Sequence, residues 1–91
     1  MVTIRIPAPL RSLTADKSEI SAEGATIAEV IDAADRNYPG LKGRLLDEKG
    51  SLRRYINIFH NDQDIRFTGA LTTPLKEGDR LAIVPAIAGG R

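Results

Sequence analysis

The sequence contains no cysteine, and this absence excludes several classes of chemistry. Without cysteine there is no disulfide framework, no thiol nucleophile and no cysteine-held zinc or iron–sulfur site, so stability must come from packing. No apolar run approaches the roughly 18 to 20 residues of a membrane span, and the N-terminus lacks a basic region followed by a long apolar segment. We therefore expect a cytoplasmic protein that has no membrane as a partner.

An excess of charge of one sign is also lacking. The 13 Lys and Arg residues nearly balance the 12 Asp and Glu residues, and the two signs are interspersed along the chain. Proteins that bind phosphate backbones carry a basic patch or stripe, so nucleic acid is not expected as a partner. The 91 residues suffice for one small domain and are too few for two, so any large ligand must bind at the surface.

Residues that could build a metal or catalytic centre are scarce. His60 is the single histidine, and beside Asn61 and Asp62 it lacks the convergent ligands of a zinc site, so we interpret it as a turn residue. The acidic residues do not have the spacing of a calcium loop, and no Ser or Thr has a second base with which to form a triad. We predict no metal site, no bound cofactor and no catalytic residue.

What the sequence does contain is the patterning of a small α+β domain. Residues 2–6 alternate apolar with polar, which predicts a half-buried strand that Pro7 and Pro9 end. A second short strand over residues 17–22 would complete a hairpin.

A helix is predicted after Gly24. The Thr26 hydroxyl can accept a hydrogen bond from the backbone three residues on while Glu29 reaches back, and Pro39 favours an end near Asn37. One apolar stripe at helical spacing is formed by Ile27, Val30, Ile31 and Ala34.

The second half of the sequence predicts three more strands. Residues 41–53 combine a short helical turn with an exposed loop, and residues 54–60 are rich in β-branched and aromatic residues typical of a strand. A turn then leads to a short strand over 65–67, and a turn at 76–79 leads to a last strand over 80–85. This order predicts an α+β fold, a mixed sheet of four to five strands with one main helix packed across it.

The alternation divides this sheet into two faces. Parity places Ile56 and Ile58 in the core together with Ile4, Ile6, Leu81 and Ile83. The opposite face then carries Arg5, Tyr55, Asn57, Phe59 and Val84, beside Thr3 and Ala82. An exposed apolar patch beside charged residues predicts a partner-docking surface, unless the loop between Leu41 and Arg53 covers the two aromatic side chains.

The sequence ends in Ala88-Gly89-Gly90-Arg91, directly after the last predicted strand. Two glycines form a narrow segment with backbone angles closed to other residues, which suits threading a carboxylate into another protein's active site. We expect a domain over residues 1–85 and a flexible tail over 86–91 that serves as a substrate. The alternative is an ordinary frayed terminus.

Several of these segments resemble the β-grasp, ubiquitin-like sulfur carriers of the MoaD/ThiS/CysO family, over the whole length of the chain. They are the helix start at 24–27, the block from Tyr55 to Phe67, the turn at 77–79 and the exit over 85–90. The loop between Leu41 and Arg53, with the Ile-Asn-Ile and Asn-Asp spacing, makes the CysO-type carriers of cysteine biosynthesis the closest branch.

The resemblance implies a protein co-substrate rather than an enzyme. A ubiquitin-activating-type adenylyltransferase would use ATP to convert the Gly90 carboxylate to an acyl adenylate, which a sulfur donor would turn into a thiocarboxylate. A pyridoxal-phosphate-dependent cysteine synthase would receive the sulfur, and a JAMM-type zinc metalloprotease would release the product.

Arg91 departs from the family pattern, which usually ends at the second glycine, and its guanidinium is too bulky for a channel shaped for two glycines. We expect Arg91 to be removed by the metalloprotease before activation, the alternative being a harmless extra residue. The functional alternatives are a MoaD-like small subunit of molybdopterin synthase, a ubiquitin-like modifier that forms isopeptide conjugates, and a purely structural β-grasp module with an inert tail.

Overall fold

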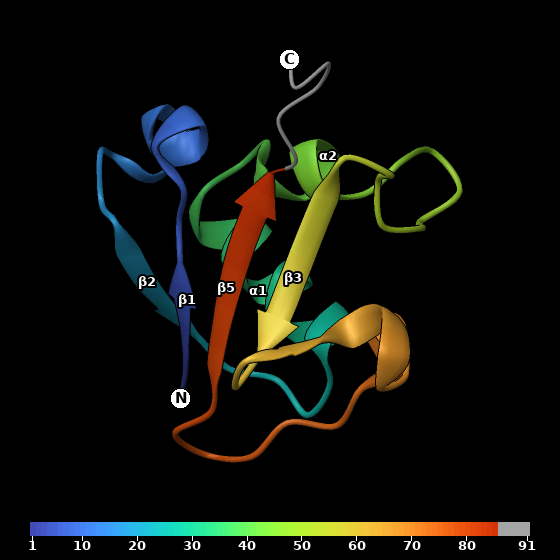
Figure 1. Ribbon diagram of the computed structural model, residues 1–91. Coiled ribbons are helices and arrows are strands. Elements are labelled where there is room, and N and C mark those ends of the chain that lie inside the picture. The colour runs from blue at the N-terminus through green and yellow to red at the C-terminus, as the bar shows by residue number, and fades with distance from the viewer. Residues whose placement is uncertain (86–91) are drawn as a thin grey trace.

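The chain folds around one mixed five-stranded sheet with its helices on one side (Figure 1). The computed structural model describes residues 1–85. The strands are β1 (Val2–Arg5), β2 (Glu19–Ala22), β3 (Ile56–His60), β4 (Gln63–Asp64) and β5 (Arg80–Pro85), and they lie side by side in the order β2-β1-β5-β3-β4. Only the central pair β1 and β5 is parallel; the other neighbours are antiparallel. The predicted α+β fold and the opening hairpin are confirmed.

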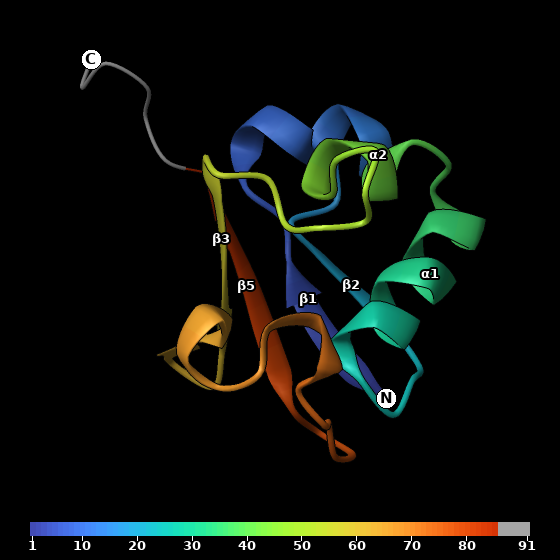
Figure 2. The same ribbon diagram turned by 90° about the vertical axis from the view of Figure 1, so that its right-hand side faces the viewer.

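The main helix α1 packs across one face of the sheet, beside a shorter helix α2 (Figure 2). Their bounds are α1 (Ile27–Asn37) and α2 (Leu41–Leu45), and residues 1–85 also contain three 3₁₀ segments: η1 (Ala8–Thr14), η2 (Ile65–Phe67) and η3 (Ala70–Thr72). The predicted end of the main helix at Asn37 is confirmed, and so is the helical turn after Gly40.

Side-chain hydrogen bonds fix both ends of α1. At its start, Thr26 Oγ1 accepts a hydrogen bond from the Glu29 N–H at 3.3 Å, as predicted. The Glu29 carboxylate reaches back to the Ala25 N–H at 3.0 Å, one residue earlier than the usual capping box. Near its end, Asp35 Oδ1 accepts from the backbone N–H groups of Gly40 and Lys42, which joins α1 to α2.

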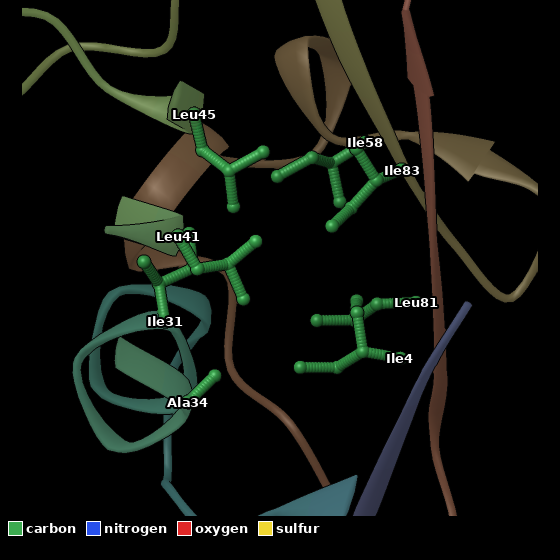
Figure 3. Close-up of a pocket in the computed structure, with 8 residues that line it drawn as sticks. All are labelled: Ile4, Ile31, Ala34, Leu41, Leu45, Ile58, Leu81 and Ile83. Atoms are coloured by element: carbon green, nitrogen blue, oxygen red, sulfur yellow. The ribbon is translucent and has the colours of Figure 1, made fainter. Parts of the chain in front are cut away.

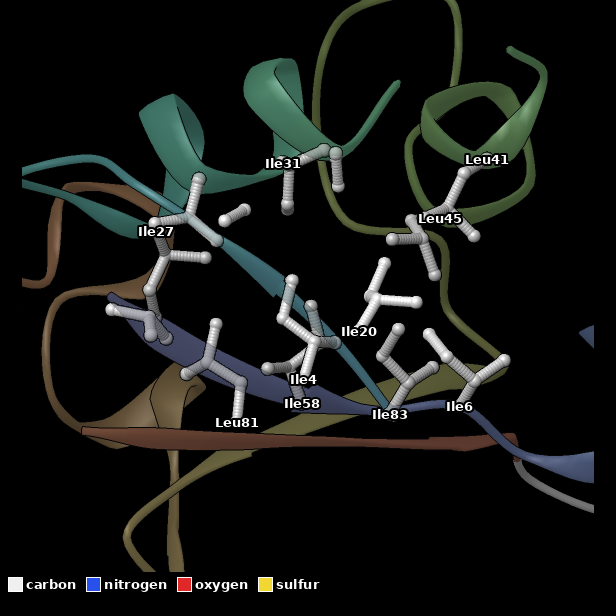
Figure 4. Close-up of a cluster of buried hydrophobic side chains, with 14 of the residues drawn as sticks. Ile4, Ile6, Ile20, Ile27, Ile31, Leu41, Leu45, Ile58, Leu81 and Ile83 are labelled. Atoms are coloured by element: carbon white, nitrogen blue, oxygen red, sulfur yellow. The ribbon is translucent and has the colours of Figure 1, made fainter. Parts of the chain in front are cut away.

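The core lies between the inner face of the sheet and the helices (Figure 4). The four residues of the predicted helical stripe are all buried, and so are the six apolar strand residues that parity assigned to the core. Eight core side chains from α1, α2 and the strands surround a gap of about 10 Å³ (Figure 3). A gap of this size without polar groups is a packing defect and not a ligand site.

Two predictions in the second half are wrong. Residues 65–67 form η2 and not a strand, because Asp64 Oδ1 accepts from the Arg66 N–H at 2.9 Å and turns the chain so that Ile65 becomes fully buried. His60 is not a turn residue: it is the last residue of β3 and pairs in register with Leu81.

Candidate functional site

The sheet face directed away from α1 and α2 carries the residues predicted to dock partners. We call this surface the outer face; it comprises Thr3, Arg5, Asn57, Phe59, Arg80, Ala82 and Val84. The register places Arg5, Ala82 and Phe59 in one row across three neighbouring strands. Four of the five predicted docking residues therefore share one surface, and the fifth, Tyr55, directly precedes β3.

Apolar side chains on this side of the molecule are open to solvent. Tyr55 is 51% exposed and Val84 is 42% exposed, so the loop over residues 41–53 does not cover Tyr55. Phe59 is half-buried and lines a shallow hollow of about 310 Å³ together with Arg5, Arg80 and other neighbours. An aromatic side chain on the same hollow as two exposed arginines forms a surface suited to protein contact.

The guanidinium group of Arg66 ties η2 to the start of β3. Its Nη2 donates to the carbonyl oxygens of Arg53 and Ile56, both at 2.9 Å, and its Nη1 donates to Asn57 Oδ1. The short strand β4 pairs only with Phe59 and His60, so it does not reach Ile56. Arg66 thus supplies donors along the edge of β3 that β4 leaves open.

At the other end of β3, His60 is fastened to the turn that precedes β5. His60 Nε2 lies 2.7 Å from Asp79 Oδ2, and Asn61 Nδ2 donates to Asp79 Oδ1 at 3.2 Å. The backbone N–H of Lys76, then His60 and Asn61, lower the pKa of Asp79 to about 2. This cluster holds two loops together and lies at the end of the sheet opposite Pro85, the last described residue.

Sequence analysis missed two exposed features of η2. Phe67 is 87% exposed, and neither this exposure nor the contacts of Arg66 were predicted. The signal for the turn is local, because an Asp side chain can accept a hydrogen bond from the backbone two residues on, as Asp64 does from the Arg66 N–H. The tail residues Ala88, Gly89, Gly90 and Arg91 lie outside the described residues.

The described residues offer neither a metal-binding cluster nor a membrane-spanning helix. Over residues 1–85, His and acidic side chains form no group of three that could hold a metal ion. No helix within the same range has the length and apolar character needed to cross a membrane.

Comparison with known proteins identifies the family. The model of the ThiS family matches residues 4–90. The sulfur carrier protein CysO of Mycobacterium tuberculosis (strain H37Rv) is 44% identical over 91 residues, which is 98% of each chain.

Solved structures agree with this match. A chain in the crystal structure of the Amycolatopsis orientalis BexX/CysO complex superposes with a TM-score of 0.93 at 44% identity, covering 99% of this chain and all of that one. Small archaeal modifier protein 1 of Methanosarcina acetivorans gives a TM-score of 0.82 at 32% identity, covering 98% of this chain and 95% of the other. The five-stranded sheet with its crossing helix is thus the β-grasp fold of these carriers, and the chain belongs to the ThiS family.

Proposed function

We propose that this chain is a sulfur carrier protein of the CysO type, a protein co-substrate whose Gly90 carboxylate is activated and then carries sulfur. The observation that supports this most strongly is the 44% identity to CysO over 98% of both chains. The family match also runs through Gly89 to Gly90, the residues that would bear the chemistry.

Activation is needed because a carboxylate is a poor electrophile, with delocalised charge and an oxide leaving group. In the proposed reaction a carboxylate oxygen of Gly90 attacks the α-phosphorus of ATP, and pyrophosphate leaves. Sulfide from a donor then adds to the acyl carbon, and the bond to AMP breaks to leave a thiocarboxylate. The adenylyltransferase supplies the groups that stabilise the developing charge, and the carrier supplies a docking surface and a narrow tail.

The outer face, together with Tyr55, would be the surface that the adenylyltransferase recognises. Its hollow beside Phe59 and the exposed side chain of Val84 offer apolar contact, and Arg5 and Arg80 offer charge. The proposed sulfur acceptor is an activated serine held on a pyridoxal-phosphate-dependent cysteine synthase: the thiocarboxylate sulfur would bond to the serine β-carbon as the activating group leaves. An acyl shift from sulfur to nitrogen would leave cysteine amide-linked to Gly90, and a JAMM-type metalloprotease would hydrolyse that amide.

Intact-mass measurement tests the proposal. The chain ending at Gly90, incubated with an adenylyltransferase of this family, ATP and sulfide, should gain the mass of one sulfur exchanged for one oxygen. A chain ending at Gly89 is the matched control and should not change. If the form ending at Gly90 stays unchanged under conditions that activate a known carrier, the proposal fails.

Removal of Arg91 is a separate step with its own test. Exposure of the 91-residue chain to a partner JAMM-type metalloprotease should remove the mass of one arginine. If that loss never occurs and the 91-residue form is nonetheless adenylated, Arg91 is not a pro-residue.

The similarity to small archaeal modifier proteins favours a second candidate, a modifier that forms isopeptide bonds with lysines of other proteins. The same acyl adenylate would then be attacked by an amine. Conjugates would appear as higher-mass bands that retain a Gly89-Gly90 remnant on lysine, whereas a carrier alone gives only the sulfur exchange.

A further inference from the structure

Arg66 lies outside β3 and β5, but it binds the stretch of β3 that pairs with the end of the last strand. Asn57 pairs in register with Val84, and Ile56 pairs with Pro85, the last described residue. Any shift of the backbone at Ile56 and Asn57 therefore moves the end of β5, from which the chain continues to Gly90.

On the side of β3 away from β5, strand pairing does not extend to Ile56 and Asn57. The strand β4 is only two residues long and stops at the level of Phe59. Before β3, the Ile56 N–H donates to the Arg53 carbonyl at 3.0 Å, so the chain makes a tight turn there. The Arg66 guanidinium bridges both sides of this turn by binding the Arg53 and Ile56 carbonyl oxygens at once.

The two residues before Arg66 fix its backbone. The Asp64 carboxylate accepts a hydrogen bond from its N–H at 2.9 Å, and the fully buried Ile65 anchors η2 in the core. The side chain is nevertheless exposed, so its role is not to fill the core. The three acceptors are bound by two separate nitrogens of a rigid planar guanidinium, whereas a lysine ammonium carries its three donors on one nitrogen and cannot occupy both positions.

From this geometry we infer that Arg66 is a positioning residue for activation: by fixing the Arg53–Asn57 turn against the end of β5, it sets where Pro85 lies relative to the docking surface, and thus the point from which the chain continues to Gly90. The inference rests on the proposed function. Loss of this bracing releases the Asn57 side chain but leaves the hollow formed by Arg5, Phe59 and Arg80 able to dock, while the carboxylate reaches the adenylylating site in the correct geometry less often.

The test measures kcat and KM separately for an adenylyltransferase that uses the carrier ending at Gly90 as its substrate. Arg66→Gln should lower kcat by roughly 10-fold or more, while KM for the carrier stays within about twofold, since misplacement of reacting groups by an ångström costs up to about 100-fold in rate. Arg66→Lys should behave as Arg66→Gln, because charge alone does not restore the three contacts.

Arg36→Gln is the matched control, because Arg36 is exposed on α1 on the other side of the sheet and makes no side-chain hydrogen bond or ion pair with the described residues. It should leave both constants unchanged. Thermal unfolding of each variant shows whether the fold is retained.

An unchanged kcat in a folded Arg66→Gln chain would overturn the inference, and so would a raised KM at constant kcat, which would make Arg66 a docking residue. Unfolding of both Arg66 variants would assign the residue to stability and overturn it as well. If the unaltered carrier ending at Gly90 is not adenylated at all, the proposed function fails before Arg66 is tested.

Discussion

Gly24 lies so close to the first turn of α1 that one added methyl group should displace the helix. A Cβ built at Gly24 would lie 2.7 Å from the Val30 nitrogen and 2.9 Å from both the carbonyl carbon and the Cβ of Glu29. Two of these atoms belong to the helix backbone and cannot rotate away, and Glu29 also makes the capping hydrogen bond to Ala25. Gly24→Ala therefore forces α1 to shift by a few tenths of an ångström or more.

The expected cost follows from these contacts. Overpacking of this kind typically costs about 1–3 kcal/mol, and loss of a helix cap about 1 kcal/mol. The smaller conformational freedom of alanine in the unfolded chain offsets about 0.4–1 kcal/mol. We expect a net destabilisation of about 2 kcal/mol, which for a domain of this size lowers Tm by roughly 8–16 °C.

Gly43→Ala is the matched control for this prediction. Gly43 lies inside α2, and a Cβ there would meet no atom within 4 Å. Alanine favours the helix over glycine by about 1 kcal/mol, so this variant should be as stable as the parent chain or more stable. Urea unfolding followed by circular dichroism measures both variants. Equal stability of Gly24→Ala and the parent chain would refute the packing argument at α1.

Two further predictions concern the Asp79 carboxylate and the outer face of the sheet. Asp79 has a folded pKa of about 2, below its ordinary value of 3.8. Its ionised form therefore stabilises the fold fully above about pH 4, by at most about 2 kcal/mol, and this contribution is lost as pH falls towards 2. Urea unfolding between pH 4 and pH 2 should show the free energy of unfolding of the parent chain falling towards that of Asp79→Asn. If the difference between the two free energies stays constant over this range, the lowered pKa is not a property of Asp79. On the outer face, Phe59→Asp should raise the adenylyltransferase KM by roughly fivefold or more with little change in kcat or Tm, since a docking aromatic contributes above about 1 kcal/mol. Loss of folding instead would make Phe59 a core residue.

Periodicity in the sequence predicted the parts of the fold that depend on one face being buried. Alternation at Ile56 and Ile58 placed β3 in the sheet correctly, and the Thr26 and Glu29 pair located the start of α1. A slip by one residue would expose the whole apolar set, so such patterns specify register strongly.

Features that depend on contacts between distant segments could not be predicted in this way. The Arg66 guanidinium binds the carbonyl oxygens of Arg53 and Ile56, which lie 13 and 10 positions earlier in the chain, so its role cannot be read from its own neighbours. The contact between His60 and Asp79 joins residues 19 positions apart and follows from the β3–β5 register. The chemistry proposed for Gly90, by contrast, is inferred entirely from sequence and family.

The central claim is that the Gly90 carboxylate of this protein is the group that an activating enzyme adenylylates. The most direct measurement is ATP–pyrophosphate exchange by the adenylyltransferase in the presence of chains ending at Gly89, Gly90 or Arg91. The claim predicts exchange with the chain ending at Gly90 and none with the other two. Equal exchange with all three chains, or none with the form ending at Gly90, would contradict it.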